Sequence, residues 1–127
     1  MNNILFLLPK FWIWWTEKTA YIFMKSLKNQ YNVYSASIFS WWERYHDFKN
    51  DSLDILIAYE NFEKLKNFVI KYKINIVYMH WISWHKNSTE FISFLIRLRD
   101  SNIKIIETSP FSLYTPNTEK YLDYKLF

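Results

Sequence analysis

Short apolar segments alternate with longer amphipathic ones along the chain. The apolar segments are short enough for strands, and continuous apolar runs are typical of strands buried on both faces. The predicted strands are residues 3–9, 33–39, 53–59, 74–80, 103–109 and 121–127. The pattern of residues 53–59 also fits the start of the next helix, and we assign it as a strand.

The segments between these strands carry apolar residues at helical spacing. Residues 17–30 form the first predicted helix, with Thr16 as its N-cap. Residues 62–73 form the second. A third helix is predicted to begin after Asn87, which forms a capping-box pattern with Glu90.

Residues 40–52 and 110–120 show no period and are predicted to be loops. Strands that alternate with helices indicate βαβ units and a parallel sheet covered on both faces. We therefore expect one α/β domain over residues 1–127, a Rossmann-like three-layer α/β/α sandwich with a mainly parallel sheet. In that sheet, residues 3–9 and 74–80 should pair in parallel.

All seven tryptophans follow the ends of predicted strands, and none falls in a predicted helix. They are Trp12, Trp14, Trp15, Trp41, Trp42, Trp81 and Trp84. The carboxyl ends of parallel strands meet at one edge of a sheet, where ligands bind in open α/β folds. We therefore expect a tryptophan rim on that edge, with at least three of the indoles substantially exposed.

Four interpretations of the tryptophan rim are open. The rim can close the core as a hydrophobic lid, stack against a sugar ring or base, contact a membrane interface, or contact another domain. Indole suits each of these because it offers a large flat apolar face and one N–H donor.

The chain of 127 residues contains no glycine and no cysteine. The lack of cysteine excludes disulfides, cysteine nucleophiles and thiolate metal sites. The lack of glycine excludes a dinucleotide-binding fingerprint, a P-loop and a serine nucleophile elbow, which all depend on glycine. Asn and Asp are expected to occupy the backbone positions that need positive φ.

The net charge of +4 and the pI of about 9.2 favour an anionic partner without identifying one. The N-terminus lacks the basic region of a signal peptide, and no run approaches the roughly 18 apolar residues of a membrane span. These features predict a cytoplasmic protein.

Histidines offer little evidence for a metal site. His46 lies in a predicted loop, and His80 ends a predicted strand, where functional groups collect. No register brings His80 and His85 together, and no carboxylate is near them in sequence, so no metal is predicted. His80 fits either a structural strand-end histidine or a substrate contact.

Three stretches follow a known pattern: NILFLLPKF before a helix, KINIVYMHW as an apolar strand ending in His, and IKIIETSPFSLYTPNTEKYLDYKLF. They resemble the opening, a buried strand and a strand-to-loop segment of the retaining GT-B glycosyltransferases of the family 4 type. The resemblance covers the whole chain but only the acceptor-binding, N-terminal half of such an enzyme. It implies that the donor-binding half is absent after the C-terminal end.

The resemblance implies part of an enzyme that moves a sugar from a nucleotide sugar to a glycan or lipid-linked acceptor. It identifies no catalytic residue, metal or cofactor in this chain. The candidate acceptor-side residues come from the tryptophan rim and from the resemblance: Trp12, Trp14, Trp15, His80, Trp81, Glu107, Thr108 and Ser109.

The chain departs from the family in two places. FWIWWTEK stands where the family has a Gly-Gly turn near the donor phosphates, and no two glutamates are eight positions apart, as they are in the family's donor domain. We therefore do not expect transfer by this chain alone. A donor-domain partner chain, a homodimer, or peripheral contact with the inner face of a membrane carrying a lipid-linked acceptor would cover the tryptophan rim.

A non-catalytic α/β binding module is the alternative, with the aromatic, mildly basic rim holding a nucleic acid or a protein. Single strands stack on aromatic residues in basic grooves. The lysines, however, are spread over the predicted helices and are not grouped with the tryptophans, so nucleic acid is not favoured. A remnant without activity is a third interpretation.

Overall fold

A computed structural model describes residues 2–9, 15–39, 45–80, 89–108 and 123–126. Its six strands form one sheet in which every pairing is parallel, in the order β3-β2-β1-β4-β5-β6. The strands are β1 (Asn3–Leu8), β2 (Asn32–Ser37), β3 (Ile55–Ile57), β4 (Ile76–His80), β5 (Lys104–Thr108) and β6 (Tyr124–Leu126).

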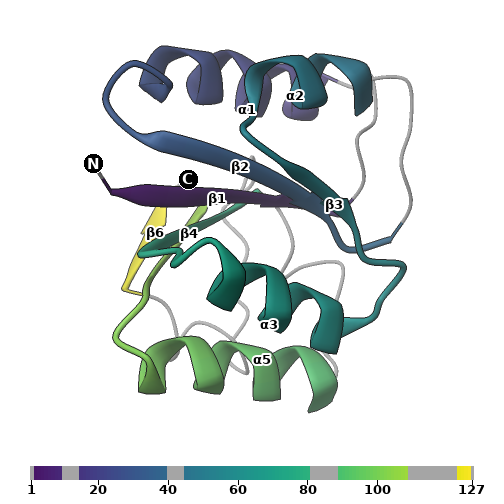
Figure 1. Cartoon of the computed structure of the whole chain (residues 1–127), viewed down its shortest axis with the longest axis vertical. Coiled ribbons are helices and arrows are strands. Elements are labelled where there is room, and N and C mark those ends of the chain that lie inside the picture. Colours follow the sequence, from purple (N-terminus) through teal and green to yellow (C-terminus); the bar gives the residue numbers. More distant parts are fainter. Residues whose placement is uncertain (1, 10–14, 40–44, 81–88, 109–122, 127) are drawn as a thin grey trace.

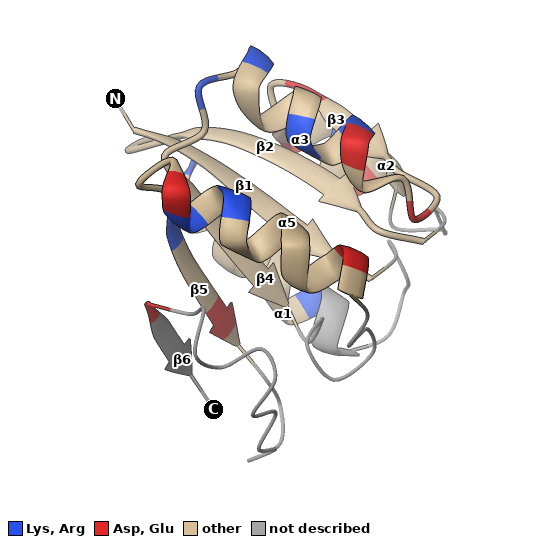
Figure 2. Cartoon of the chain, turned by 90° about the horizontal axis from the view of Figure 1, so that it is seen from below, with Lys and Arg blue, Asp and Glu red and all other residues tan. Residues whose placement is uncertain are grey.

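Helices cover both faces of this sheet (Figure 1). On one face lie α1 (Trp15–Leu27) and α2 (Tyr45–Asp51). On the other lie α3 (Phe62–Lys71) and α5 (Thr89–Asp100), which run side by side in Figure 2. The Rossmann-like α/β/α sandwich and its parallel sheet are therefore confirmed, including the parallel pairing of β1 with β4.

The central strand β1 explains the continuous apolar run near the N-terminus. Leu5 and Leu7 are fully buried in the core beneath α3 and α5, and Phe6 and Leu8 are fully buried in the core beneath α1 and α2. Burial on both faces removes the need for an alternating polar pattern.

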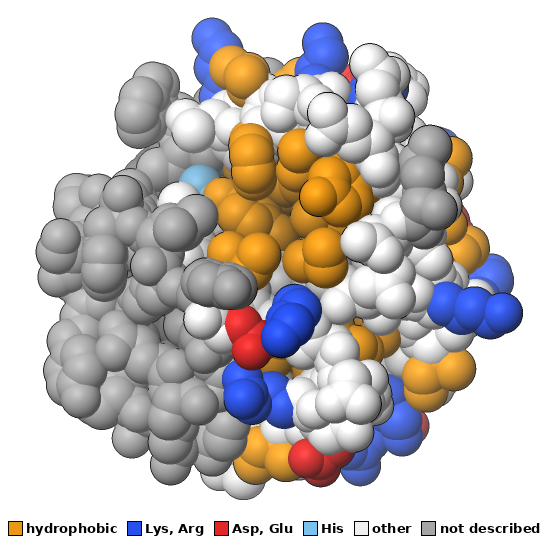
Figure 3. All heavy atoms as spheres, turned by 90° about the vertical axis from the view of Figure 1, so that its left-hand side faces the viewer, with side chains coloured by type: hydrophobic (Ala, Val, Ile, Leu, Met, Phe, Trp, Pro, Cys, Tyr) orange, Lys and Arg blue, Asp and Glu red, His pale blue; other side chains and the backbone are white. Residues whose placement is uncertain are grey.

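Asparagines join the beginnings of the three central strands. Asn3 donates its backbone N–H to Oδ1 of Asn75 at 2.9 Å, and its Oδ1 accepts from Nδ2 of Asn32 at 2.8 Å. These contacts lie at the edge of the sheet where the strands begin, which faces the viewer in Figure 3. A patch of hydrophobic side chains lies on this surface, with basic side chains above and below it.

Turns that need positive φ are made without glycine. Four described residues have positive φ: Tyr59 (50°), Glu60 (62°), Lys73 (51°) and Asn102 (60°). Asn102 fits the expectation that Asn and Asp take such positions, and for the other three the expectation is wrong. Lys73 and Asn102 follow α3 and α5, where a left-handed residue satisfies the last carbonyls of a helix. The N–H of Ile74, for example, donates to the carbonyl of Val69 at 3.0 Å.

Two local predictions are wrong. Residues 45–51 form α2 rather than a loop, and α1 begins at Trp15, so Thr16 lies inside the helix instead of capping it. The first error arises because α2 is seven residues long and buries only Phe48, which leaves no period to detect. The second arises because aromatic residues carry only a modest helix penalty and do not stop a helix.

Asp51, the last residue of α2, links this helix to α1. Its carboxylate accepts from the Tyr21 hydroxyl of α1 at 2.5 Å and from Nζ of Lys28 at 2.6 Å. The hydrogen bond from Lys28, and then that from Tyr21, lower the pKa of Asp51 below its ordinary value. The carboxylate is 14% exposed, so solvent screens this cluster only in part.

We expect Asp51→Asn to lower the free energy of unfolding at pH 7 by about 1–2 kcal/mol, because a hydrogen-bonded charge is lost. The folded pKa lies below the unfolded value of about 3.9, so the carboxylate stabilises the protein above that value and stops doing so as the pH falls through the folded pKa. Urea unfolding between pH 7 and pH 3 should show the difference between wild type and variant shrinking at the acid end. Asp100→Asn, on the exposed end of α5, is the control; an equal loss there would contradict the prediction.

Candidate functional site

The order of the strands creates a switch point between β1 and β4. After β1 the chain passes to α1 on one face of the sheet, and after β4 it passes to α5 on the other face (Figure 1). Ligands of open α/β sheets bind in the crevice outside the carboxyl ends of the strands at such a point. The carboxyl edge at β1 and β4 is therefore the candidate functional site.

The tryptophan-bearing segments begin at three neighbouring strands, β2, β1 and β4. The tryptophans outside the described residues are Trp12, Trp14, Trp41, Trp42, Trp81 and Trp84. Their common edge and their exposure stay predictions. The prediction that no tryptophan falls in a helix is wrong, because Trp15 is the first residue of α1.

His80 and Thr108 lie next to each other across the last rung of β4 and β5. Side chains alternate between the faces of a strand, so both belong to the face that also carries Tyr78, beneath the layer of α1 and α2. His80 is 3% exposed, whereas Thr108 is partly accessible. Thr108 is therefore the residue of this pair that a ligand can contact.

Tyr78 is a member of this group that sequence reasoning missed. Its hydroxyl donates to Oγ1 of Thr108 at 2.5 Å. Its ring packs against Phe6 and Phe23, with ring centroids 5.0 and 5.2 Å away. The available signal was its position two residues before His80, which places it on the same face of the strand.

Burial raises the pKa of the Tyr78 phenol, and the hydrogen bond with Thr108 offsets part of that rise. The phenol therefore stays protonated at neutral pH and acts as a hydrogen-bond donor. Because the Thr108 oxygen accepts this hydrogen bond, the hydrogen of its own hydroxyl is available to a further acceptor.

Glu107 is separated from this group by the sheet. It is 1% exposed and lies in register with Met79, on the face covered by α3 and α5. The structure therefore brings His80 and Thr108 together but not Glu107. Ser109 and Trp81 lie outside the described residues.

The described part of the site offers neutral polar groups and aromatic rings. The hydroxyl of Thr108 is partly accessible and can donate a hydrogen bond to a neutral ligand, while the buried phenol of Tyr78 holds that hydroxyl in place. Within the described ranges, no group of three or more His, Asp or Glu side chains could hold a metal ion. None of the described helices has both the length and the apolar character needed to cross a membrane.

Comparison with known proteins gives no relative: no protein-family model matches the chain, and no curated protein matches it significantly. The geometry of the carboxyl edge is therefore the evidence on which a functional proposal depends.

We expect a double-mutant cycle to detect the hydrogen bond between Tyr78 and Thr108. Thr108→Val should lower the free energy of unfolding by about 1–3 kcal/mol, because it leaves a buried phenol unpaired, and Tyr78→Phe by about 1 kcal/mol. The double variant should lose less than the sum of the two, by about 0.5–1.5 kcal/mol, in chemical denaturation. Tyr59→Phe, at a residue that is 62% exposed, should change little; additive losses at Tyr78 and Thr108 would contradict the pairing.

Proposed function

We propose that this chain is the acceptor-binding domain of a GT-B glycosyltransferase of the family 4 type, which moves a sugar from a nucleotide sugar to a glycan or lipid-linked acceptor. One observation carries the proposal. The carboxyl ends of β1 and β4 meet at a switch point, and His80 and Thr108 lie at the ends of β4 and its neighbour β5.

The chemistry of the described residues supports a sugar rather than a charged ligand. Sugar rings present many hydroxyl groups and apolar C–H faces. The hydroxyl of Thr108, held in place by Tyr78, suits the first, and aromatic side chains suit the second. The segments that follow β1, β2 and β4 in the sequence contain six tryptophans.

The role proposed for this site is acceptor binding. A donor nucleotide sugar carries phosphates, and backbone cradles for phosphates depend on glycine, of which the chain has none. Donor binding is therefore assigned to a separate domain or partner chain.

The proposal is tested by binding the protein to an array of immobilised oligosaccharides and titrating the ones that bind, with tryptophan fluorescence as the readout. Thr108→Ala should weaken binding about three- to tenfold, because one neutral hydrogen bond is lost. Ser101→Ala removes a hydroxyl at the opposite edge of the sheet and should leave binding unchanged. Failure of every glycan to bind, or binding of single-stranded oligonucleotides instead, would overturn the proposal.

A second expectation concerns the donor. Calorimetry with UDP- and GDP-sugars should show no micromolar binding to this chain, because it lacks both a glycine phosphate loop and a pair of glutamates eight positions apart. Stoichiometric micromolar binding of either sugar nucleotide would assign the donor site to this chain and contradict the division of roles.

A further inference from the structure

A groove of about 560 Å³ lies between α3 and α5, at the edge of the sheet where the strands begin. It is therefore on the opposite edge from the candidate acceptor site. Its apolar floor comes from the middle and later turns of both helices and from the turns that follow them. The floor residues are Val69, Ile70, Ile74, Phe94, Leu98 and Ile103.

Aromatic packing confines the groove to one end of the helix pair. At the beginning of α3, Phe62 packs against Phe91 and Phe94 of α5, with ring centroids 5.9 and 5.8 Å away. No such ring contact joins the later turns of α3 and α5 in the described structure. Val69, Ile74 and Leu98 are buried at the base of the groove there, and Ile70 is 62% exposed. Exposed aliphatic surface of this kind gains free energy when an apolar ligand covers it.

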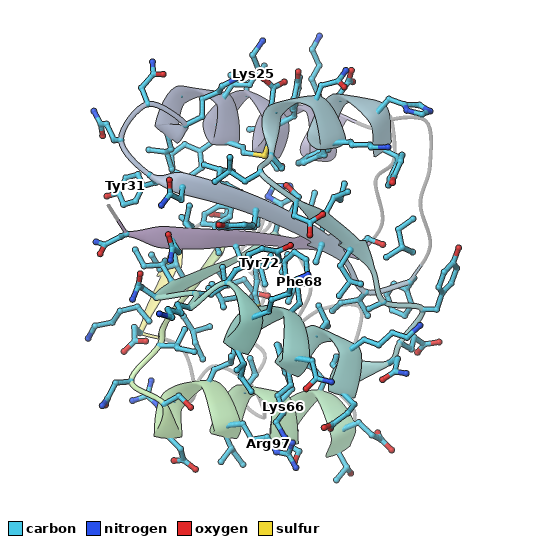
Figure 4. The ribbon with its side chains drawn as sticks, in the orientation of Figure 1. Lys25, Tyr31, Lys66, Phe68, Tyr72 and Arg97 are labelled. Carbon is cyan, nitrogen blue, oxygen red and sulfur yellow. The ribbon has the colours of Figure 1, made fainter. Side chains whose placement is uncertain are left out.

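The rim of the groove is basic. Lys66, Lys73 and Arg97 line it together with one carboxylate, Asp100. Lys66 belongs to α3 and Arg97 to α5, and the two lie near each other in Figure 4. Their nitrogens are 3.4 and 3.6 Å from the oxygens of the same residue, Glu63, which is 65% exposed. Exposed ion pairs at such distances contribute little, so an anionic ligand can compete with Glu63.

We propose that this groove binds a single-chain amphiphile with an anionic head, such as a fatty acid. The aliphatic chain lies along the floor, and the head accepts hydrogen bonds from Lys66 and Arg97. The groove volume is in the range of small-molecule sites, about 300–1,000 Å³. Twelve residues line the groove, fewer than the roughly 20–30 residues a side of a stable protein interface, which favours a small ligand over a docked protein.

The probe for the first experiment is dodecanoate, titrated below its micelle concentration and followed by calorimetry and by NMR of methyl groups. We expect saturable binding at one site, with shifts at Val69, Ile70 and Leu98. Dodecyl maltoside and dodecyltrimethylammonium share the tail but lack the anionic head, and should bind at least about tenfold more weakly. Acetate, which has the head without the tail, should not bind.

Further ligands distinguish the sources of the anionic head. Dodecyl phosphate should bind as dodecanoate does if the rim recognises negative charge in general. Binding only to phosphatidylglycerol vesicles, or only to an acidic amphipathic peptide, would overturn the proposal in favour of a membrane or protein surface. Equal binding of all dodecyl compounds would also overturn it, because the basic rim would then have no role.

Matched variants assign the site. Ile70→Ser and Arg97→Gln should each weaken dodecanoate binding about five- to tenfold, because they remove floor area and one charged donor. Ile96→Ser and Arg99→Gln make the same changes on α5 outside the groove and should leave binding unchanged. All four residues are exposed, and circular dichroism verifies folding. Equal losses in the matched pairs would place binding elsewhere and refute the assignment.

Discussion

The pairing of β1 with β2 on one side and β4 on the other is the constraint on which the rest of the structure depends. β1 can occupy this central position because its residues are apolar on both faces, with Leu5 and Leu7 buried on one and Phe6 and Leu8 on the other. A strand with one polar face could not be covered by helices on both sides. The chain passes from β1 to a helix on one face of the sheet and from β4 to a helix on the other, so the switch point lies between these two strands. The apolar run of β1 permits this arrangement because helices can then cover both of its faces.

Most of this architecture could be predicted because buried strands and amphipathic helices leave periodic patterns in the sequence. The helix α2 could not, since Phe48 is its one buried residue and the packing partners that stabilise it, Tyr21 of α1 among them, are distant in sequence. The positive φ values of Tyr59 and Glu60 could not be predicted from the sequence either. Left-handed backbone costs a non-glycine residue about 1–2 kcal/mol, and only the tertiary structure decides which residue bears that cost.

The candidate site was predictable to the extent that it depends on strand ends. His80 and Thr108 were both assigned to the carboxyl edge from sequence, and their strands are neighbours in register. The face of each side chain follows from the two-residue period of a strand once the register is known, and the register is a property of the folded sheet. That period puts Glu107 on the far side of the sheet and adds Tyr78 to the group of Thr108.

Basic residues of the described helices lie away from the candidate functional site. Each of the four described helices carries a basic residue in its last turn, where it complements the negative end of the helix dipole. The helices of βαβ units run opposite to the strands, so these last turns lie toward the edge where the strands begin. Among the described residues, Arg97 of the last turn of α5 lines the groove together with Lys66 and Lys73, whereas Tyr78 and Thr108 provide neutral groups at the other edge. The amphiphile proposed for the groove between α3 and α5 is therefore the anionic partner that the net charge favours, and the proposed sugar recognition at the carboxyl edge does not depend on that charge.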